Sequence, residues 1–255
     1  MALFSSGDTL ASHYNLFYSQ TYISRMSNSL TSFNLKNGLV VSCQAPPNSP
    51  LYNSEIIAAM AQASINCGAV GVRVDTPSHV QAVRNKMSHI PIIGLWKQQI
   101  QGCEVYITPR FSDAVAIAQA GADIIAIDGT PRQRPDGETL EGLITSIHTE
   151  LDKLVMADVD TLENAIAATA AGADIVGTTL YGYTSETKHL SPPGWQLLEE
   201  MVQTLDVPAI CEGGIASPVM AKKALELGAY SVVVGTAITG IDLQVKAYVS
   251  NLNQD

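Results

Sequence analysis

A short motif recurs at nearly even spacing along most of this 255-residue chain. A Gly-Ala pair stands immediately before four apolar runs, and the pairs lie 51 to 56 residues apart: Gly68-Ala69, Gly121-Ala122, Gly172-Ala173 and Gly228-Ala229. A repeat of this length accommodates two strand–helix units. Such a repeat favours strands that close into a ring, because a doubly wound sheet does not need one.

Eight compact apolar runs, rich in Val and Ile, make up this pattern. Runs of this kind are typical of strands buried on both faces of a parallel sheet. Amphipathic stretches such as 54–68 and 161–172 separate most of them and end in glycine, as helices often do. The runs occupy residues 38–43, 69–74, 90–96, 122–128, 153–159, 173–179, 207–213 and 229–235. We therefore expect an α/β fold, a single (β/α)8 TIM barrel over residues 34–255.

Three further observations bear on the organisation of the chain. Thr76-Pro77 and Ser217-Pro218 are each typical of a helix N-cap followed by proline in the first turn. A doubly wound sheet is the alternative fold, but no GxGxxG motif follows the first apolar run, so nothing indicates a dinucleotide site. Residues 1–33 are rich in Ser, Tyr and Asn and show no periodicity. We interpret them as a mobile N-terminal extension.

Composition narrows the classes of partner and compartment. The chain is 46% hydrophobic and 15% charged, with a net charge of −10. This acidity argues against nucleic acid or an anionic membrane as the main partner, but an anionic small substrate stays open. No apolar run approaches about 18 residues and the N-terminus lacks a basic start, so neither a membrane helix nor a secretory signal is expected. The cysteines form no CxxC pair and the histidines no HxH or HExxH spacing, which predicts a cytoplasmic protein without a metal site.

Polar side chains end nearly every apolar run. In a TIM barrel the carboxyl ends of the strands carry the chemistry, and a charge buried there is costly unless it is paired or used. An ion-pair network that closes this end of the barrel is the structural alternative. The residues in question are Gln44, Arg73, Asp75, Lys97, Asp128, Asp158, Thr178, Thr179, Glu212, Gly235 and Thr236.

Lys97 and Glu212 are the candidate acid and base. They follow the third and seventh strands, so in a ring of eight they face each other across the mouth. Opposed groups suit an inversion at a carbon next to a carbonyl, in which one group removes a proton and the other returns one to the opposite face. A structural Lys97–Glu212 pair and a Schiff base on Lys97 are the alternatives.

The loops after the last two strands are rich in small residues. Gly213 and Gly214 follow the seventh run, and Gly235 and Thr236 follow the eighth. Their backbone N–H groups would converge beside a short helix, as in the usual phosphate site of such barrels. Glycine required by tight bends is the alternative explanation. The residues alone thus indicate a barrel enzyme that acts on a small phosphorylated compound.

Several of these segments together resemble the N-acetylmannosamine-6-phosphate 2-epimerase family. The resemblance extends from about Leu35 to Val249 and is carried by GLVVSCQA, GAVGVRV, PIIGLWK, EVYITP, ADIIAIDGTPRQRPDGETLE, LVMADVDTLENA, ADIVGTTLYGYT, CEGGIASP and KKALELGAYSVVVGTAIT. It implies an isomerase that interconverts N-acetylmannosamine 6-phosphate and N-acetylglucosamine 6-phosphate in sialic-acid breakdown. No cofactor or metal is needed, because an open-chain aldehyde at C1 acidifies the hydrogen at C2.

The resemblance also assigns roles. Lys97 becomes the base and Glu212 the acid at C2, and Arg73 is the candidate donor to the enolate oxygen. The glycines of the loops after the seventh and eighth strands become the ligands of the phosphate. The resemblance also implies a homodimer. The sugar hydroxyls and the N-acetyl group are assigned to Gln44, Arg73 and Asp158, with Thr178 as a further substrate-binding residue.

Two positions depart from the family pattern. Many members have arginine where this chain has Gly214 and Gly240. The absence of these arginines weakens binding of the phosphate or substrate unless the backbone, Arg132 or Arg134 compensates. Clamping an anion and pairing with Asp128 are the two roles open to Arg132 and Arg134. The alternative functions are therefore another phosphosugar isomerase or lyase of the same fold and a non-catalytic barrel that binds a phosphosugar.

Overall fold

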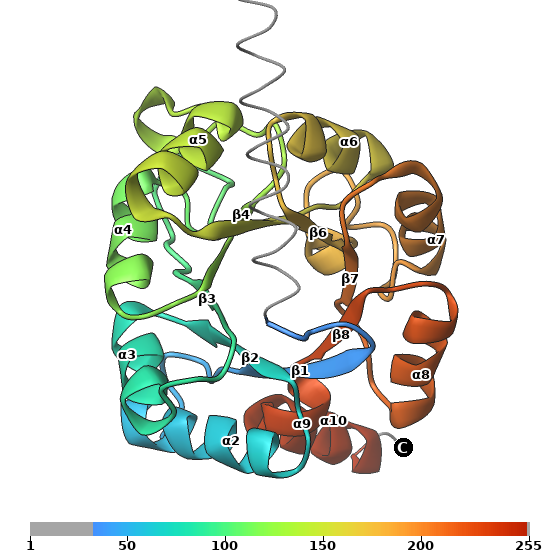
Figure 1. Cartoon of the computed structure of the whole chain (residues 1–255). Coiled ribbons are helices and arrows are strands. Elements are labelled where there is room, and N and C mark those ends of the chain that lie inside the picture. The colour runs from blue at the N-terminus through green and yellow to red at the C-terminus, as the bar shows by residue number, and fades with distance from the viewer. Residues whose placement is uncertain (1–32, 254–255) are drawn as a thin grey trace, which may run out of the picture. The chain divides into compact units, whose positions relative to one another are not determined.

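The strands of the chain close into a ring (Figure 1). The computed structural model describes residues 33–253, and the chain from Leu35 onward forms one compact unit. Each strand pairs in parallel with the next, and the last pairs with the first. The strands are β1 (Gly38–Cys43), β2 (Gly71–Asp75), β3 (Ile92–Leu95), β4 (Ile124–Asp128), β5 (Leu154–Asp158), β6 (Ile175–Gly177), β7 (Ala209–Glu212) and β8 (Ser231–Val234). The predicted TIM barrel is confirmed, and the doubly wound sheet was wrong because a closed barrel has no edge strands.

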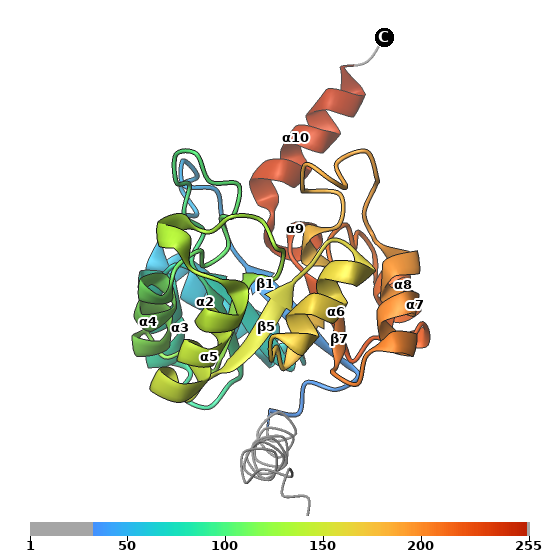
Figure 2. The same ribbon diagram turned by 90° about the horizontal axis from the view of Figure 1, so that it is seen from above.

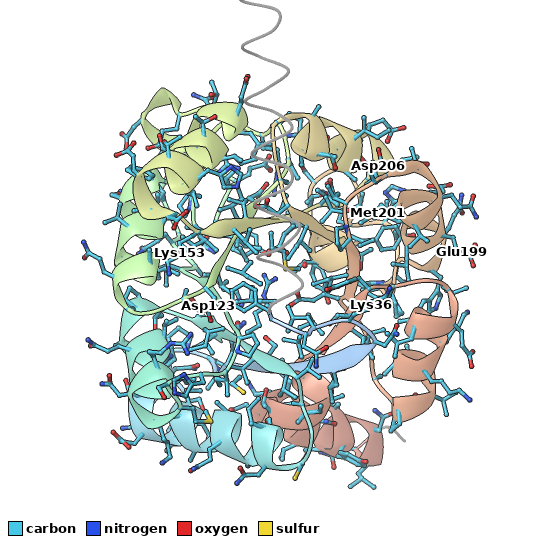
Figure 3. The ribbon with its side chains drawn as sticks, in the orientation of Figure 1. Lys36, Asp123, Lys153, Glu199, Met201 and Asp206 are labelled. Atoms are coloured by element: carbon cyan, nitrogen blue, oxygen red, sulfur yellow. The ribbon has the colours of Figure 1, made fainter. Side chains whose placement is uncertain are left out.

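Helices surround this ring on the outside (Figure 1). Figure 3 shows how one of them is oriented: Met201 of α7 lies between the helix and the barrel, whereas Glu199 points outward. Packing of the helices around the barrel thus buries one stripe of each helix against the strands. The helices are α2 (Ser54–Asn66), α3 (Pro77–Lys86), α4 (Phe111–Gln119), α5 (Leu140–Leu151), α6 (Leu162–Ala170), α7 (Trp195–Thr204), α8 (Pro218–Glu226), α9 (Thr236–Thr239) and α10 (Ile241–Leu252), with 3₁₀ turns η1 (Pro135–Gly137) and η2 (Thr178–Leu180).

The Gly-Ala repeat has a conformational basis. All four glycines have φ between 96° and 104°, a region that side chains rarely adopt. After α4, the Gly121 N–H bonds to the Ala118 carbonyl at 3.0 Å and the Ala122 N–H to that of Ile117 at 3.3 Å. These bonds end the helix in a left-handed glycine cap. Ala122 then leads towards β4 with its side chain buried.

The two predicted proline-containing helix starts differ. Ser217 is an ordinary N-cap, since its hydroxyl accepts the Met220 N–H at 3.3 Å. Thr76 stands at the N-cap position of α3 but makes no side-chain cap bond, and its φ is +73°. Its hydroxyl is buried without a partner among the described residues. A β-branched residue with this φ marks local strain.

The helix that follows β8 does not lie alongside the barrel. After the short α9, α10 extends away beyond one end of the ring (Figure 2). Among the described elements α9 is the one that α10 contacts extensively, and no residue of α10 is buried.

Within residues 33–253 no helix is long and apolar enough to cross a membrane. The predicted N-terminal extension lies almost entirely outside the described residues.

Candidate active site

Three charged side chains from widely separated strands meet at the carboxyl end of the barrel. Arg73 of β2 donates to both carboxylate oxygens of Asp158 on β5, at 3.0 and 2.5 Å. The same guanidinium lies 2.8 Å from Oε2 of Glu212, the last residue of β7. Arg73 and Asp158 are almost completely buried, whereas the Glu212 side chain is 13% exposed. The arrangement places one cation between two carboxylates in a site with little water.

The charges of this cluster are set by burial and by one another. Burial raises the pKa of Glu212 to about 7, and the negative charge of Asp158 adds to the rise although Arg73 opposes it. Burial lowers the pKa of Arg73, but the two carboxylates outweigh this effect and raise it above its usual value. Arg73 is therefore always charged, while Glu212 holds a proton in a large fraction of molecules near neutral pH. A carboxyl group of this kind can act as a general acid.

Two consecutive threonines hold Glu212 in place. The Thr178 hydroxyl donates to the backbone carbonyl of Glu212 at 2.8 Å and accepts its N–H at 3.0 Å. Thr179 places its hydroxyl 2.6 Å from Asp158 and 3.2 Å from Oε2 of Glu212. The strand prediction ran through both residues, but β6 ends at Gly177 and a 3₁₀ turn follows. Thr178 is thus fully buried against the backbone, and Thr179 is the hydroxyl that contacts both carboxylates; substrate binding by Thr178 stays a prediction.

Lys97 extends from the segment after β3. Its ammonium donates to Oε1 of Gln44 at 2.5 Å, and the Gln44 amide donates in turn to the Ser42 hydroxyl at 2.9 Å. Within residues 33–253 no ion pair joins Lys97 to Glu212, so the structural pair considered as an alternative is absent there. The positive charge of Lys97 is nevertheless close enough to lower the pKa of Glu212. The two groups therefore share the mouth without neutralising each other directly.

A further buried carboxylate, Asp128, ends β4 and is enclosed by the loop that follows. Asp128 accepts the Thr130 N–H and hydroxyl at 2.9 and 2.6 Å and pairs with Arg132 at 2.6 Å. Arg134 donates to the backbone carbonyl of Asp128. Both arginines that sequence analysis considered as anion ligands are thus bound to Asp128. Burial still raises the pKa of Asp128, although Arg132 opposes the rise.

Tyr106 is a residue of the site that sequence analysis did not single out. It belongs to the EVYITP segment, which the family resemblance had flagged only as a motif. Burial and the charges of Asp158 and Asp128 raise its pKa to about 12. Its phenol therefore stays protonated beside these carboxylates and is a hydrogen-bond donor.

The predicted phosphate loops lie side by side because β7 pairs with β8. Gly213 and Gly214 have φ of +101° and +69°, so their backbone conformation requires glycine. Gly235 precedes α9, and Thr236 is its first residue. Phosphate binding by these four residues stays a prediction. No cluster of three or more His, Cys, Asp or Glu that could hold a metal occurs in the part of the chain that the structure describes.

Comparison with known proteins identifies the family of this chain. Residues 57–254 match the family described as "Putative N-acetylmannosamine-6-phosphate epimerase". Two relatives carry the name "Putative N-acetylmannosamine-6-phosphate 2-epimerase". The protein from Thermosynechococcus vestitus is 63% identical over 218 residues, which are 86% of this chain and 94% of the relative. The protein from Synechococcus elongatus is 60% identical over 220 residues, which are 86% of this chain and 95% of the relative.

Solved structures agree with this result. The N-acetylmannosamine-6-phosphate 2-epimerase from Clostridium perfringens has a TM-score of 0.81 and 40% identity, over 85% of this chain and 93% of that one. A thiamine phosphate pyrophosphorylase from Pyrococcus furiosus, with a TM-score of 0.55 and 17% identity, over 81% of this chain and 89% of that one, shares the fold alone. The chain therefore belongs to the N-acetylmannosamine-6-phosphate 2-epimerase family.

Proposed function

We propose that this protein interconverts N-acetyl-D-mannosamine 6-phosphate and N-acetyl-D-glucosamine 6-phosphate, a step of amino-sugar and sialic-acid breakdown. The observation that supports this most directly is the pair formed by Glu212 and Lys97. One is a carboxyl group whose pKa is raised to about 7, and the other is an amine on the opposite side of the barrel mouth. Epimerisation at C2 needs an acid and a base on opposite faces of the carbon.

The reaction balances with these two groups alone. Lys97 in its neutral form takes the C2 proton of the open-chain aldehyde, and the electron pair moves into an enolate whose negative charge rests on the C1 oxygen. Glu212 then donates its proton to the other face of C2, which restores the aldehyde. Lys97 is left protonated and Glu212 ionised, so exchange of one proton with solvent resets the site. The reverse reaction uses the same groups in exchanged roles.

The surrounding residues are assigned to binding. Arg73 has one N–H group, at Nε, without a partner among the described residues, and this group is the candidate donor to the enolate oxygen. Gln44 and Asp158 bind the hydroxyl and N-acetyl groups, together with Thr178. The backbone N–H groups of Gly213, Gly214, Gly235 and Thr236 bind the phosphate. No cofactor takes part.

The decisive experiment follows hydrogen exchange at C2. N-acetylmannosamine 6-phosphate is incubated with the protein in D2O and observed by NMR. We expect the N-acetylglucosamine product and deuterium at C2, with both lost in Lys97→Ala and product formation strongly reduced in Glu212→Gln. Lys36→Ala, at an exposed position labelled in Figure 3, is the control that keeps full activity. Full turnover by Lys97→Ala would overturn the assignment of the base, and binding without turnover would instead favour a non-catalytic phosphosugar-binding barrel.

We further propose that the protein is a homodimer in which a second copy covers α10. Ile241, Val245, Tyr248, Val249 and Leu252 share one face of this helix, and all five are exposed, Leu252 to 82%. A continuous apolar stripe on a projecting helix marks an interaction site. On α8 the Val219 side chain is 78% exposed, and we propose this face of the second copy as the surface that α10 contacts.

The dimer is tested by analytical ultracentrifugation. We expect the wild-type protein to sediment at twice the mass of one chain and Val245→Glu/Val249→Glu to sediment as a monomer. Lys246→Glu, which changes charge away from the stripe, should stay dimeric. A monomeric wild type would refute the proposal without affecting the epimerase assignment.

The acidity of the chain continues to argue against nucleic acid and anionic membranes as partners.

A further inference from the structure

Lys97 lies outside every strand and helix of the barrel. β3 ends at Leu95, α4 begins at Phe111, and the connection between them is long for a strand-to-helix loop. A lysine side chain has four rotatable bonds, so a base on a long loop is precise only where its backbone is fixed. The hydrogen bonds of this loop therefore bear directly on the reaction proposed above.

One side chain bonds the backbone of Lys97 itself. Oδ1 of Asp75, the last residue of β2, accepts the Lys97 N–H at 2.9 Å. The N–H of the next residue, Thr76, bonds to the Leu95 carbonyl at 2.9 Å, so β2 remains attached to the chain up to the end of β3. Asp75 continues this attachment beyond the strand, because its carboxylate takes the place of a backbone carbonyl.

The other side of Lys97 is held by the returning half of the loop. Lys97 forms an antiparallel bridge with Ile107, and the Gln98 N–H bonds to the Tyr106 carbonyl at 2.9 Å. The Thr108 hydroxyl accepts the Trp96 N–H at 3.1 Å and donates to the Ala126 carbonyl of β4 at 2.7 Å.

Two backbone outliers flank this arrangement. Thr108 has a φ of +43° and Thr76 a φ of +73°. Both are β-branched, and strain at such residues persists only where the surroundings enforce it. The loop that carries Lys97 is thus clamped between β2 and β4 at the cost of two strained residues.

Charge supports the same interpretation of Asp75. Burial raises the pKa of its carboxyl, while the nearby Lys97 charge and the Lys97 N–H oppose the rise. The charge of His79, whose ring lies edge-on to Tyr52 with centroids 4.6 Å apart, also opposes the rise in the pKa of Asp75. Asp75 thus has both a backbone bond and a charge interaction with the residue that we assign as the base.

We propose that Asp75 is a positioning residue for epimerisation, whose carboxylate fixes the main chain of Lys97 so that the amine beside Gln44 reaches the C2 proton. The proposal rests on the function proposed above. Displacement of a reacting group by about 1 Å can slow a reaction by about 100-fold. Asp75 itself need not touch the substrate, so its loss should change kcat rather than KM.

The chain offers a matched control, an aspartate that bonds the backbone at the other end of β3. Oδ2 of Asp123 accepts the N–H of Ile92, the first residue of β3, at 2.9 Å and also pairs with Arg84. Figure 3 labels Asp123, which lies just before β4 and therefore at the end of the barrel where the strands begin. Asp123 thus holds the first residue of β3, and Asp75 holds the chain two residues beyond its last residue, by the same kind of bond.

The test compares Asp75→Ala, Asp75→Asn and Asp123→Ala. We expect Asp75→Ala to lower kcat by about 10- to 100-fold with KM changed less than about threefold. Asp75→Asn, which keeps an acceptor oxygen, should recover most of this loss. Asp123→Ala should lose stability without a comparable loss of kcat. Equal kcat in Asp75→Ala and wild type, or equal losses in Asp75→Ala and Asp123→Ala, would overturn the proposal.

A second measurement does not depend on activity. Hydrogen exchange followed by NMR should show faster exchange of the Lys97 amide in Asp75→Ala than in wild type, with no such change in Asp123→Ala. Unchanged exchange at Lys97 would show that Asp75 does not hold this residue. If wild-type protein failed to epimerise the sugar, the proposed function would fall, and the exchange measurement would still decide whether Asp75 fixes Lys97.

Discussion

The raised pKa of Glu212 makes the stability of the protein depend on pH in an unusual direction. The pKa of this carboxyl is about 7 in the folded protein, whereas the ordinary value of a glutamate, which applies to the unfolded chain, is 4.5. Between these values the folded state binds more protons than the unfolded one, so the free energy of unfolding falls as pH rises. The difference between the two pKa values corresponds to about 3 kcal/mol. This contribution is fully present below pH 4.5 and is lost as pH rises to about 7.

Glu212→Gln isolates this effect, because glutamine has nearly the same shape and does not titrate. We expect urea unfolding at a series of pH values to show the variant gaining about 3 kcal/mol relative to wild type between pH 4.5 and 7. Glu199→Gln, an exposed carboxylate on α7, is the control whose difference from wild type should stay flat. Groups away from the substituted residue titrate alike in each pair, so the difference reports the substituted carboxyl and the charges that it contacts.

The result that refutes this reasoning is a flat or falling difference for Glu212→Gln. It would mean that Arg73, 2.8 Å from Oε2, stabilises the carboxylate more than burial penalises it. Enzyme assays provide a consistency check. If Glu212 is the acid, the pH profile of kcat for N-acetylmannosamine 6-phosphate should change slope near pH 7, where Glu212 loses its proton.

Other substitutions test how the site is held together. Arg73→Met leaves two buried carboxylates without their cation and should cost about 3–5 kcal/mol in chemical denaturation. Thr178→Val removes the hydroxyl that bonds the Glu212 backbone at both its N–H and its carbonyl; about 1–3 kcal/mol should be lost, with reduced kcat. Gly214→Ala should lower the unfolding free energy by about 1–3 kcal/mol, since its φ is +69° and a Cβ would lie 2.7 Å from Pro192.

The barrel and the central cluster could be predicted because both follow from local patterns. Apolar runs predict buried strands, and the closed ring then places the strand ends together at one mouth. Asp158 and Glu212 each end a strand, and Arg73 lies two residues before the end of β2, so their meeting at the mouth follows from the closed ring. The exact strand ends do not follow, because they depend on backbone bonds. β6 stops at Gly177 since the Thr178 hydroxyl bonds the backbone of Glu212.

Contacts between distant loops could not be predicted in this way. The bond from the Lys97 N–H to Asp75 joins a side chain to a backbone group 22 residues away and depends on the register of β2 and β3. The position of α10 is a similar case. Its amphipathic pattern indicates a helix, but the pattern is the same whether the apolar stripe faces its own barrel or a second copy.

Gly214 and Gly240, where the family resemblance leads us to expect arginine, show how one loop can constrain another. A Cβ at Gly214 would lie 2.7 Å from the backbone of Pro192, and a Cβ at Gly240 would lie 2.7 Å from the backbone of Thr236. Neither contact is with a flexible side-chain end, so an arginine at either position requires the β6–α7 loop or α9 to move. Under the proposed function we therefore assign phosphate binding in this chain to backbone N–H groups. Since Pro192 packs directly on Gly214, the β6–α7 loop becomes part of what shapes that site.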